Sequence, residues 1–325
     1  MKSRYRIQKY AILGIFLGVL FGFGVCHSTQ AETGGQEKEL KIALLPILDV
    51  LPFYVAEAEG YFEGSGFKIT AIPVASGLSR DQLMQAGEID GMLNEMTTTG
   101  SFNRKGVQIK ILMSARKAYA GSPLFRILAS QKGGLKSPTD LAGVSIGVSV
   151  NTIIEYVTDR MLAAEGLSRD RIIMKSVPVI PERYQLLMQG QLKAATLPDP
   201  LGLSALAAGA VSIVDDSVYP HYSVSVLSFS VKALKEKGEG IRFFLKTWDE
   251  AAGKINADPA AYRPLLLKKI RVPKNVQGGY PVPIYPRREV PDSEQWADVM
   301  TWMVEKGLLT TPLSYEQSVT KVFIP

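Results

Sequence analysis

Three acidic side chains stand where the chain is stiff enough to present a carboxylate to a ligand. Asp199 lies between Pro198 and Pro200, Asp49 lies between the prolines of PILDVLP, and Glu95 follows a short apolar run. A fixed acid at the end of a strand has few structural roles, which makes Asp199 the strongest candidate. Asp49 could equally cap the helix that follows it, and Glu95 could be solvated. A carboxylate pair such as Glu95 and Asp199 could also transfer protons.

Two predicted helix starts supply backbone N–H donors. Ser76 and Gly77 lead into a helix that we expect Ser79 to cap, and Asn151 and Thr152 start another. Backbone N–H groups at a helix start can hold a carboxylate, a sulfonate or a ring carbonyl. Each start could equally be a satisfied cap without a ligand. The complete set of candidate ligand-binding residues is Pro46, Asp49, Ser76, Gly77, Asn94, Glu95, Met96, Ser114, Asn151, Thr152, Asp199 and Tyr222.

Two members of this set are chosen for their side-chain chemistry. Ser114 ends the apolar run QIKILMS and could donate a hydrogen bond, and the ring of Tyr222 could stack on a flat ligand. The neighbouring His221 is more often a surface residue than a ligand contact when a histidine stands alone at such a position.

Residues 1–31 have the pattern of an export signal. Four basic residues precede an uncharged apolar run over 11–25, and Thr29 and Ala31 suit a cleavage site. This run is shorter than the roughly 20 apolar residues of a membrane-spanning helix. We expect cleavage after Ala31 and a location in the periplasm or at the outer face of the cytoplasmic membrane. An uncleaved membrane anchor and a lipid attached to Cys26 are the alternatives.

The net charge of +6 belongs mostly to this signal. The chain has 37 basic and 31 acidic residues, and the signal contains four basic and no acidic ones, which leaves +2 for the mature chain. The basic pI is therefore no evidence for a nucleic-acid partner. The mature chain has no cysteine and keeps only His221, which excludes disulfides, thiolate nucleophiles and His-based zinc sites. We expect no catalytic residue, metal or cofactor.

The elements that must position these residues alternate along the chain. After a flexible leader at 32–37, short apolar runs alternate with helical patterns, and this alternation predicts an α/β fold with largely parallel sheets. A stripe of Trp296, Val299, Met300 and Met303 predicts a late helix that ends before Gly307. The predicted strands are 40–45, 68–74, 108–114, 144–149, 172–177 and 211–214.

A weak internal repeat predicts how the two halves relate. LMQAGEIDGMLNE (83–95) and LLMQGQLKAATLPD (186–199) both have a helix end, a glycine and a short strand. With Leu83 set against Leu186, Gly87 falls on Gly190. We expect both strands to point their carboxyl ends at one crevice, where open α/β sheets bind ligands.

Several segments resemble ABC-transporter solute-binding proteins. PFYVAEAEGYF (52–62) and ASGLSRDQLMQAGEID (75–90) resemble their first lobe, and LKSPTDLAGVSIGVSVNTIIEYVTDRMLAAEGL (135–167) resembles their second. MQGQLKAATLPDP (188–200) matches the place where these proteins carry an acid followed by proline. The most similar subgroup handles nitrate, taurine, alkanesulfonates and thiamine-pyrimidine precursors, and the resemblance runs from about residue 40 to the end of the chain.

The resemblance implies a type II periplasmic-binding fold. This is an α/β fold of two Rossmann-like lobes joined by a two-crossover hinge, with the ligand cleft between the lobes. The crossovers would lie near 118–124 and 219–225. Lobe I would comprise 38–120 plus 221–325, and lobe II would comprise 121–220.

The implied function is that of an extracytoplasmic solute-binding component of an ABC importer. The expected partners are a small-molecule solute and the ABC permease with its ATPase, and we expect a monomer. Arg80, Arg116 and Lys117 follow the turns and are expected to point outward, which leaves the acids to dominate the crevice. A strict anion receptor would bring Arg or Lys inward, so we expect a neutral or cationic nitrogen-containing solute, pyrimidine-like or an amine.

Other functions remain open at this point. The same mechanism could bind a sulfonate, nitrate or taurine, because helix N-termini alone can bind anions. An enzyme of thiamine-pyrimidine precursor metabolism and a sensor that reports to a receptor are further alternatives.

Overall fold

The computed structural model describes residues 38–64 and 66–325. The predicted signal peptide, the leader at 32–37 and the lipid alternative at Cys26 lie outside the described residues. Within the described residues, no helix is both long and apolar enough to cross a membrane.

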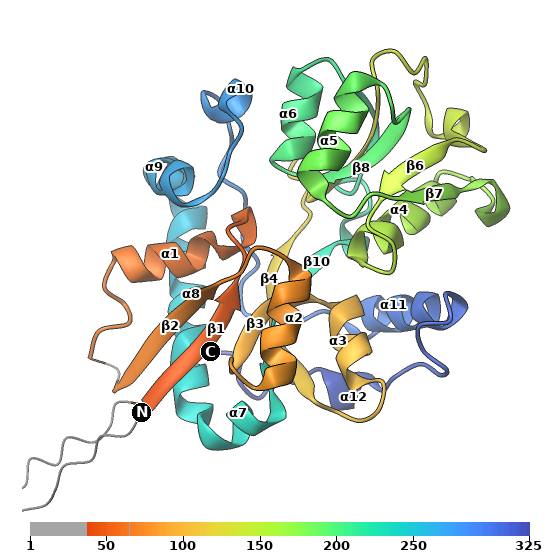
Figure 1. Ribbon diagram of the computed structural model, residues 1–325. Helices are drawn as coiled ribbons and strands as arrows, with labels where there is room; N and C mark the ends of the chain where they lie inside the picture. Colours follow the sequence, from red (N-terminus) through yellow and green to blue (C-terminus); the bar gives the residue numbers. More distant parts are fainter. Residues whose placement is uncertain (1–37, 65) are drawn as a thin grey trace, which may run out of the picture. The chain divides into compact units, whose positions relative to one another are not determined.

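Two mixed sheets organise the described strands (Figure 1). The first has the order β2-β1-β3-β10-β4 and contains β1 (Lys38–Leu44), β2 (Phe67–Pro73), β3 (Gly91–Glu95), β4 (Ile109–Lys117) and β10 (Val224–Ser230). The second has the order β7-β6-β8-β5-β9 and contains β5 (Phe125–Ala129), β6 (Ser145–Val148), β7 (Ile173–Ser176), β8 (Ala194–Pro198) and β9 (Val211–Asp215). In each sheet three neighbouring strands are parallel, and one antiparallel strand joins a further strand to them. The α/β fold class predicted from the sequence is confirmed.

Helices alternate with many of the strands, and a run of helices without strands follows the last strand, β10. Those near the first sheet are α1 (Leu51–Ala58), α2 (Gly77–Ala86), α3 (Met96–Asn103), α7 (Val231–Glu236), α8 (Gly238–Ala257), α9 (Pro259–Lys269), α10 (Lys274–Gln277), α11 (Ser293–Glu305) and α12 (Tyr315–Ser318). Those near the second are α4 (Ile153–Ala164), α5 (Ile180–Gln189) and α6 (Leu201–Ala207). Four short 3-10 segments complete the list: Leu48–Val50, Pro138–Leu141, Arg169–Arg171 and Pro220–Tyr222.

Both faces of each sheet are buried, as parallel sheets require. On β1, Ile42 packs into a cluster with α1 and α8, whereas the adjacent Ala43 packs on the opposite face with Met84 of α2. On β5, Ile127 joins the cluster of α4 and Leu128 joins that of α5. Each large side chain fully buried in this way contributes about 1.5–3 kcal/mol, so the alternation of side chains along the strands fixes their orientation.

The internal repeat corresponds to two matching helix-to-strand units. The helix α2 leads to β3 in the first sheet, and α5 leads to β8 in the second. Gly87 and Gly190 end these helices in the left-handed conformation, with φ of 73° and 78°. Glycine adopts this conformation without the Cβ penalty of other residues, which explains its recurrence at this position.

Two connections join the sheets, and one buried carboxyl lies beside both. Residues 118–124 run from β4 to β5, and 216–223 run from β9 to β10. Asp216 is fully buried and accepts hydrogen bonds from the N–H groups of Leu124 and Phe125 at 2.9 and 3.0 Å. Burial raises the pKa of Asp216 to about 7. The lobe boundaries proposed from the sequence stay a prediction.

The start of α2 differs from the sequence prediction. The helix begins at Gly77, and its cap is Ser76, not Ser79. Each of these two serine hydroxyls accepts the other residue's backbone N–H at 3.2 Å. Ser79 therefore fills the role usually taken by Glu or Gln in a capping box, which moves the helix start three residues toward the N-terminus.

Candidate ligand site at the carboxyl ends of the strands

The candidate residues gather at the carboxyl ends of the parallel strands, called here the carboxyl edge of each sheet. Pro46 and Asp49 follow β1, Ser76 and Gly77 follow β2, and Glu95 ends β3. In the second sheet, Asn151 and Thr152 follow β6, and Asp199 follows β8. This edge is where α/β sheets bind ligands. The ligand-binding roles of these residues stay predictions.

Asp49 is a buried partner of Arg116 and does not stand alone in a crevice. Arg116 Nη1 lies 3.3 Å from Asp49 Oδ1, and Nη2 donates to the carbonyl of Pro123 at 3.1 Å. Both side chains are less than one-tenth exposed. Burial alone would lower the pKa of Arg116, but nearby groups, led by Asp49 and including Asp199, raise it. Arg116 therefore points inward, contrary to the sequence prediction.

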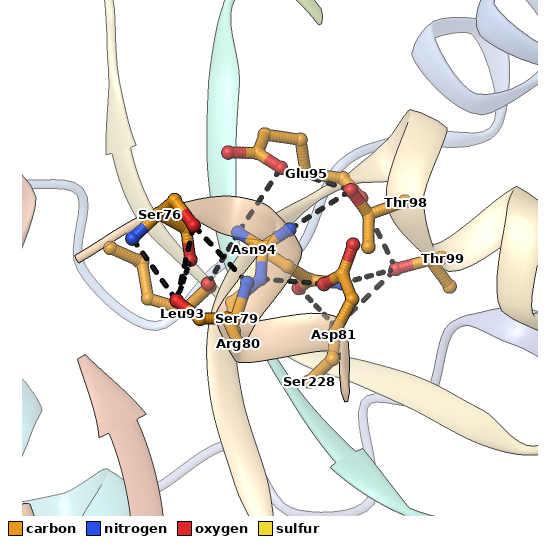
Figure 2. Close-up of polar contacts among 10 residues, drawn as sticks. All are labelled: Ser76, Ser79, Arg80, Asp81, Leu93, Asn94, Glu95, Thr98, Thr99 and Ser228. Carbon is orange, nitrogen blue, oxygen red and sulfur yellow. Dashed lines mark hydrogen bonds and ion pairs between the residues drawn. The ribbon is translucent and has the colours of Figure 1, made fainter. Parts of the chain in front are cut away.

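Glu95 is paired with Arg80, at the centre of a closed polar network (Figure 2). Arg80 is 3% exposed, and all of its guanidinium nitrogens have partners. Nη1 donates to the Leu93 carbonyl at 3.0 Å and lies 3.4 Å from Glu95, Nε donates to Asp81 at 2.8 Å, and Nη2 donates to Thr98 at 3.2 Å. The prediction that Arg80 points outward is wrong, because its neighbours supply two carboxylates and a carbonyl.

Asp199 has the structural roles that the sequence argument did not foresee. Its two oxygens accept hydrogen bonds from Nε and Nη2 of Arg126 at 2.9 and 3.0 Å. Oδ1 also accepts the N–H of Leu203 in the first turn of α6 at 3.0 Å. A bidentate arginine pair of this kind is among the stronger polar contacts.

These three pairs overturn the electrostatic argument made from the sequence. Asp49, Glu95 and Asp199 each have an arginine within hydrogen-bond distance, and Lys117 pairs with Glu289 at 2.7 Å. The arginines that pair with Asp49 and Asp199 are 67 and 73 residues away in sequence, so local patterns could not reveal these pairs. The premise that no arginine points inward to these acids is wrong, whereas the expected neutral or cationic nitrogen-containing solute stays a prediction.

Four further candidates lie inside the protein or away from the carboxyl edges. Asn94 and Met96 are fully buried and Ser114 is 2% exposed, and the Asn94 side chain bonds to Thr99 and Ser228 (Figure 2). Tyr222 packs edge-on against Tyr156 of α4, with ring centroids 6.3 Å apart. These four shape the walls, but the structure does not bring them together with the exposed candidates.

Charged groups from the carboxyl edges of both sheets act on Tyr280, a residue that the sequence did not single out. This residue lies on the chain between α10 and α11 and is 3% exposed. Burial raises the pKa of Tyr280, as does Asp199 of the second sheet, while Arg116 and Arg126 lower it. One tyrosine thus lies within electrostatic reach of ion pairs from both sheets.

Exposed apolar side chains lie along the same edges. Ile47 follows β1, Leu78 starts α2, Val150 follows β6 and Val179 follows β7, with exposed fractions from 36% to 70%. Sequence patterning missed them because apolar residues next to a strand are ordinarily assigned to the core. Their loop positions were the available signal, since apolar residues have no folding reason to follow a strand into a loop.

A cavity of about 380 Å³ opens beside α4 and β7, and its lining includes Val150 and Asn151 of the carboxyl edge. Its wall includes Glu155 and Asp159, and both carboxylates are already paired. Glu155 lies 2.6 Å from Lys306, and Asp159 lies 3.1 Å from Arg169. The charges of this cavity are therefore satisfied by the protein itself.

Comparison with known proteins identifies the family of this chain. A family model described as NMT1/THI5 like matches residues 48–262. The chain belongs to the NMT1/THI5-like family. One curated relative is described as an ABC transporter periplasmic binding protein of Brachyspira hyodysenteriae. It is 22% identical over 75% of this chain and 73% of its own length. Another is the formylaminopyrimidine-binding protein of Halalkalibacterium halodurans, which is 21% identical over 97% of this chain and 99% of its own length.

Solved structures share the fold of this NMT1/THI5-like protein. The aliphatic sulphonate binding protein SsuA of Escherichia coli has a TM-score of 0.72 at 18% identity, covering 87% of this chain and 92% of its own. The desulfurization enzyme DszB has a TM-score of 0.62 at 14% identity, covering 88% and 97%. The protein is an ABC-type periplasmic solute-binding protein, and its family indicates an extracytoplasmic location.

Proposed function

We propose that this protein captures a small organic solute between the carboxyl edges of its two sheets and delivers it to an ABC permease with its ATPase. The observation that carries the proposal is the row of exposed apolar side chains along these edges, Ile47, Leu78, Val150 and Val179. They would contact the apolar body of the solute and lose their exposure to water, each contributing up to about 1.5–3 kcal/mol.

The charge pairs narrow the solute class. Because each of the three predicted acids is already paired with an arginine, none of them is a free carboxylate that would favour an amine. We infer a neutral or anionic organic solute, such as a pyrimidine-like compound or a sulfonate. Micromolar binding requires about −8 kcal/mol, within reach of apolar burial and a few hydrogen bonds.

Closure would be driven by contacts that form only when the solute is bound. One pair of hydrogen bonds already joins α6, near the second sheet, to α10, near the first, in this structure. Ser204 Oγ donates to Asn275 Oδ1 at 2.8 Å, and Asn275 Nδ2 donates to the Ser204 carbonyl at 3.0 Å. The closed surface is what the permease would recognise.

The same charge pairs support binding and not catalysis. Glu95 and Asp199, the pair that could have transferred protons, are held by Arg80 and Arg126. An arginine partner stabilises the ionised carboxylate and opposes its use as a proton donor near neutral pH. We infer that the protein releases its solute unchanged.

A thermal-shift panel tests the proposal. Purified protein is heated with pyrimidines, amines, alkanesulfonates and nitrate, and small molecules that co-purify with it are extracted and identified. We expect at least one organic member to raise Tm and the radius of gyration measured by X-ray scattering to fall with it. Turnover of the bound compound, or nitrate as the only stabilising member, would contradict the proposal.

A further inference from the structure

Among the residues that the structure describes, Arg183 is a buried charge without a counter-ion. Its side chain is fully buried in α5, and Nη1 donates to Ser149 Oγ at 3.0 Å and to the Val177 carbonyl at 3.1 Å. Within the described part of the chain, Nε and Nη2 have no partner and no carboxylate pairs with the guanidinium. Burial lowers the pKa of Arg183 to about 10. Burying a charge in this way is unfavourable for folding unless something compensates it.

The guanidinium reaches the carboxyl edge of the second sheet. Ser149 and Val177, which its Nη1 contacts, directly follow β6 and β7. Gly147 in β6 lies beside the stem, since a Cβ there would lie 3.4 Å from Arg183 Cγ and Cδ. An arginine near a surface normally extends its head into water, but this one is held beneath the edge.

Ser149 connects the buried charge with the start of α4. Its hydroxyl accepts the hydrogen bond from Arg183 and donates to the Pro178 carbonyl at a long 3.3 Å. The α4 helix has 12 residues, and the N-terminus of such a helix carries a partial positive charge. A solute oxygen placed here would accept a hydrogen bond from the Ser149 hydroxyl, and this bond would be shorter than the one to Pro178. The arginine would polarise the hydroxyl and strengthen that bond.

The other charged groups at this turn cancel. Glu155 accepts the N–H of Asn151, and its second oxygen lies 2.6 Å from Lys306. Glu155 is therefore engaged by Lys306 and does not neutralise Arg183.

We propose that Arg183 is a positioning residue that makes the second-sheet side of the site select an anionic group of the solute, acting through the hydroxyl of Ser149. This inference rests on the proposed function and narrows it to solutes with a sulfonate or carboxylate on an organic body. The apolar body would lie along Val150 and Val179, which flank the same turn and are exposed.

Calorimetric titration with compounds of one body and different charge tests this inference. The panel is para-toluenesulfonate, para-toluate, para-toluamide and para-methylbenzylamine, used with wild type, Ser149→Ala and Ser130→Ala. Ser130 is the matched control, because it is an equally buried serine that follows β5 at the opposite edge of the same sheet. We expect the wild type to bind the two anions and Ser149→Ala to lose about ten-fold in affinity for them. Ser130→Ala should bind as the wild type does.

Two substitutions of the arginine separate charge selection from folding. Arg183→Met should abolish the preference for anions over the amide, and Arg183→Lys should restore part of it. A preference of the wild type for the amide or the amine would overturn the inference and leave the solute-binding function standing. Equal losses for anions and amide in Ser149→Ala would overturn it too. If neither the panel nor any extracted compound binds, the proposed function fails with it.

Discussion

The two copies of the internal repeat carry an arginine at the same position, but only one of these arginines is neutralised. Aligning Leu83 with Leu186 places Arg80 on Arg183, and both side chains are buried in the first turns of equivalent helices. The residues around the first supply two carboxylates, Asp81 and Glu95. At the matching positions the second copy has Tyr184 and Pro198.

The difference assigns distinct roles to the two halves. In the first copy the arginine is a structural centre whose bonds tie the start of α2 to the end of β3 (Figure 2). In the second copy the arginine keeps its charge and lies beneath the carboxyl edge of the second sheet, where we propose that the solute binds. A repeat can thus keep a fold while changing its electrostatics through two neighbouring residues.

The largest expected effect is the cost of removing the neutralised arginine. Arg80→Met would leave Asp81 and Glu95 without their cation, and we expect a loss of about 3 kcal/mol in the free energy of unfolding. Arg183→Met, the matched change in the second copy, removes an uncompensated charge but also a donor to Val177. It should stay within about 1 kcal/mol of wild type. Urea unfolding of both variants measures the contrast, and equal losses would break the comparison.

Packing around the second arginine gives the next effect. In Gly147→Ala the new Cβ would lie 2.7 Å from Leu192 Cδ1 and in contact with the Arg183 stem. We expect overpacking to cost about 2 kcal/mol, measured as a lower urea midpoint at unchanged slope. Gly278→Ala is the control, since its added Cβ meets nothing within 4 Å and its φ of −58° suits alanine.

Supplying the missing carboxylate should make the second copy behave like the first. Tyr184→Asp places an acid where Asp81 stands, next to Arg183. The ratio of anion to amide affinity should fall about ten-fold, because the ion pair would compete with the solute. Tyr184→Asn loses the same ring and its contact with Ser204 without adding charge, so it should keep the ratio. An unchanged ratio in Tyr184→Asp would contradict the role given to Arg183.

The last prediction is a dependence of stability on pH, and it concerns Asp216 beside the connections between the halves. Its pKa in the folded protein is about 7, above the ordinary value of 3.8, so the folded state binds more protons between these values. Its contribution to stability is therefore full below about pH 4 and is lost as the pH rises toward 7, by at most about 1.4 kcal/mol per pH unit. Asp216→Asn should lack this loss. Thermal or urea unfolding of the wild type and Asp216→Asn is measured from pH 4 to 7. A difference in unfolding free energy between the two that does not change with pH would contradict the prediction.

Much of the fold could be predicted from local patterns. The parallel strands, the helix stripe at Trp296 and the repeat with Gly87 and Gly190 all appear in the structure at or near their predicted places. The strands β5 and β10 were missed. In β10 serines alternate with apolar residues, which suggests a half-exposed strand, yet Ser225 and Ser228 are buried.

The candidate site could be predicted in location but not in chemistry. Residues such as Ser76 and Asn151 lie at the carboxyl edges because loop position follows from strand direction. The roles of Asp49 and Asp199 could not be anticipated, since their arginines are 67 and 73 residues away in sequence. The importance of Arg183 was also missed, although the repeat already aligned it with Arg80.

The sequence by itself determined the order of strands and helices, the repeat and the family resemblance, because these depend on local spacing and side-chain type. Only the tertiary structure decided which charges cancel. Ion pairing depends on distances between residues far apart in the chain, and one unpaired guanidinium among many paired ones is visible only when its surroundings are known. That distinction moves the solute that we propose from a neutral or cationic nitrogen-containing compound to an organic anion.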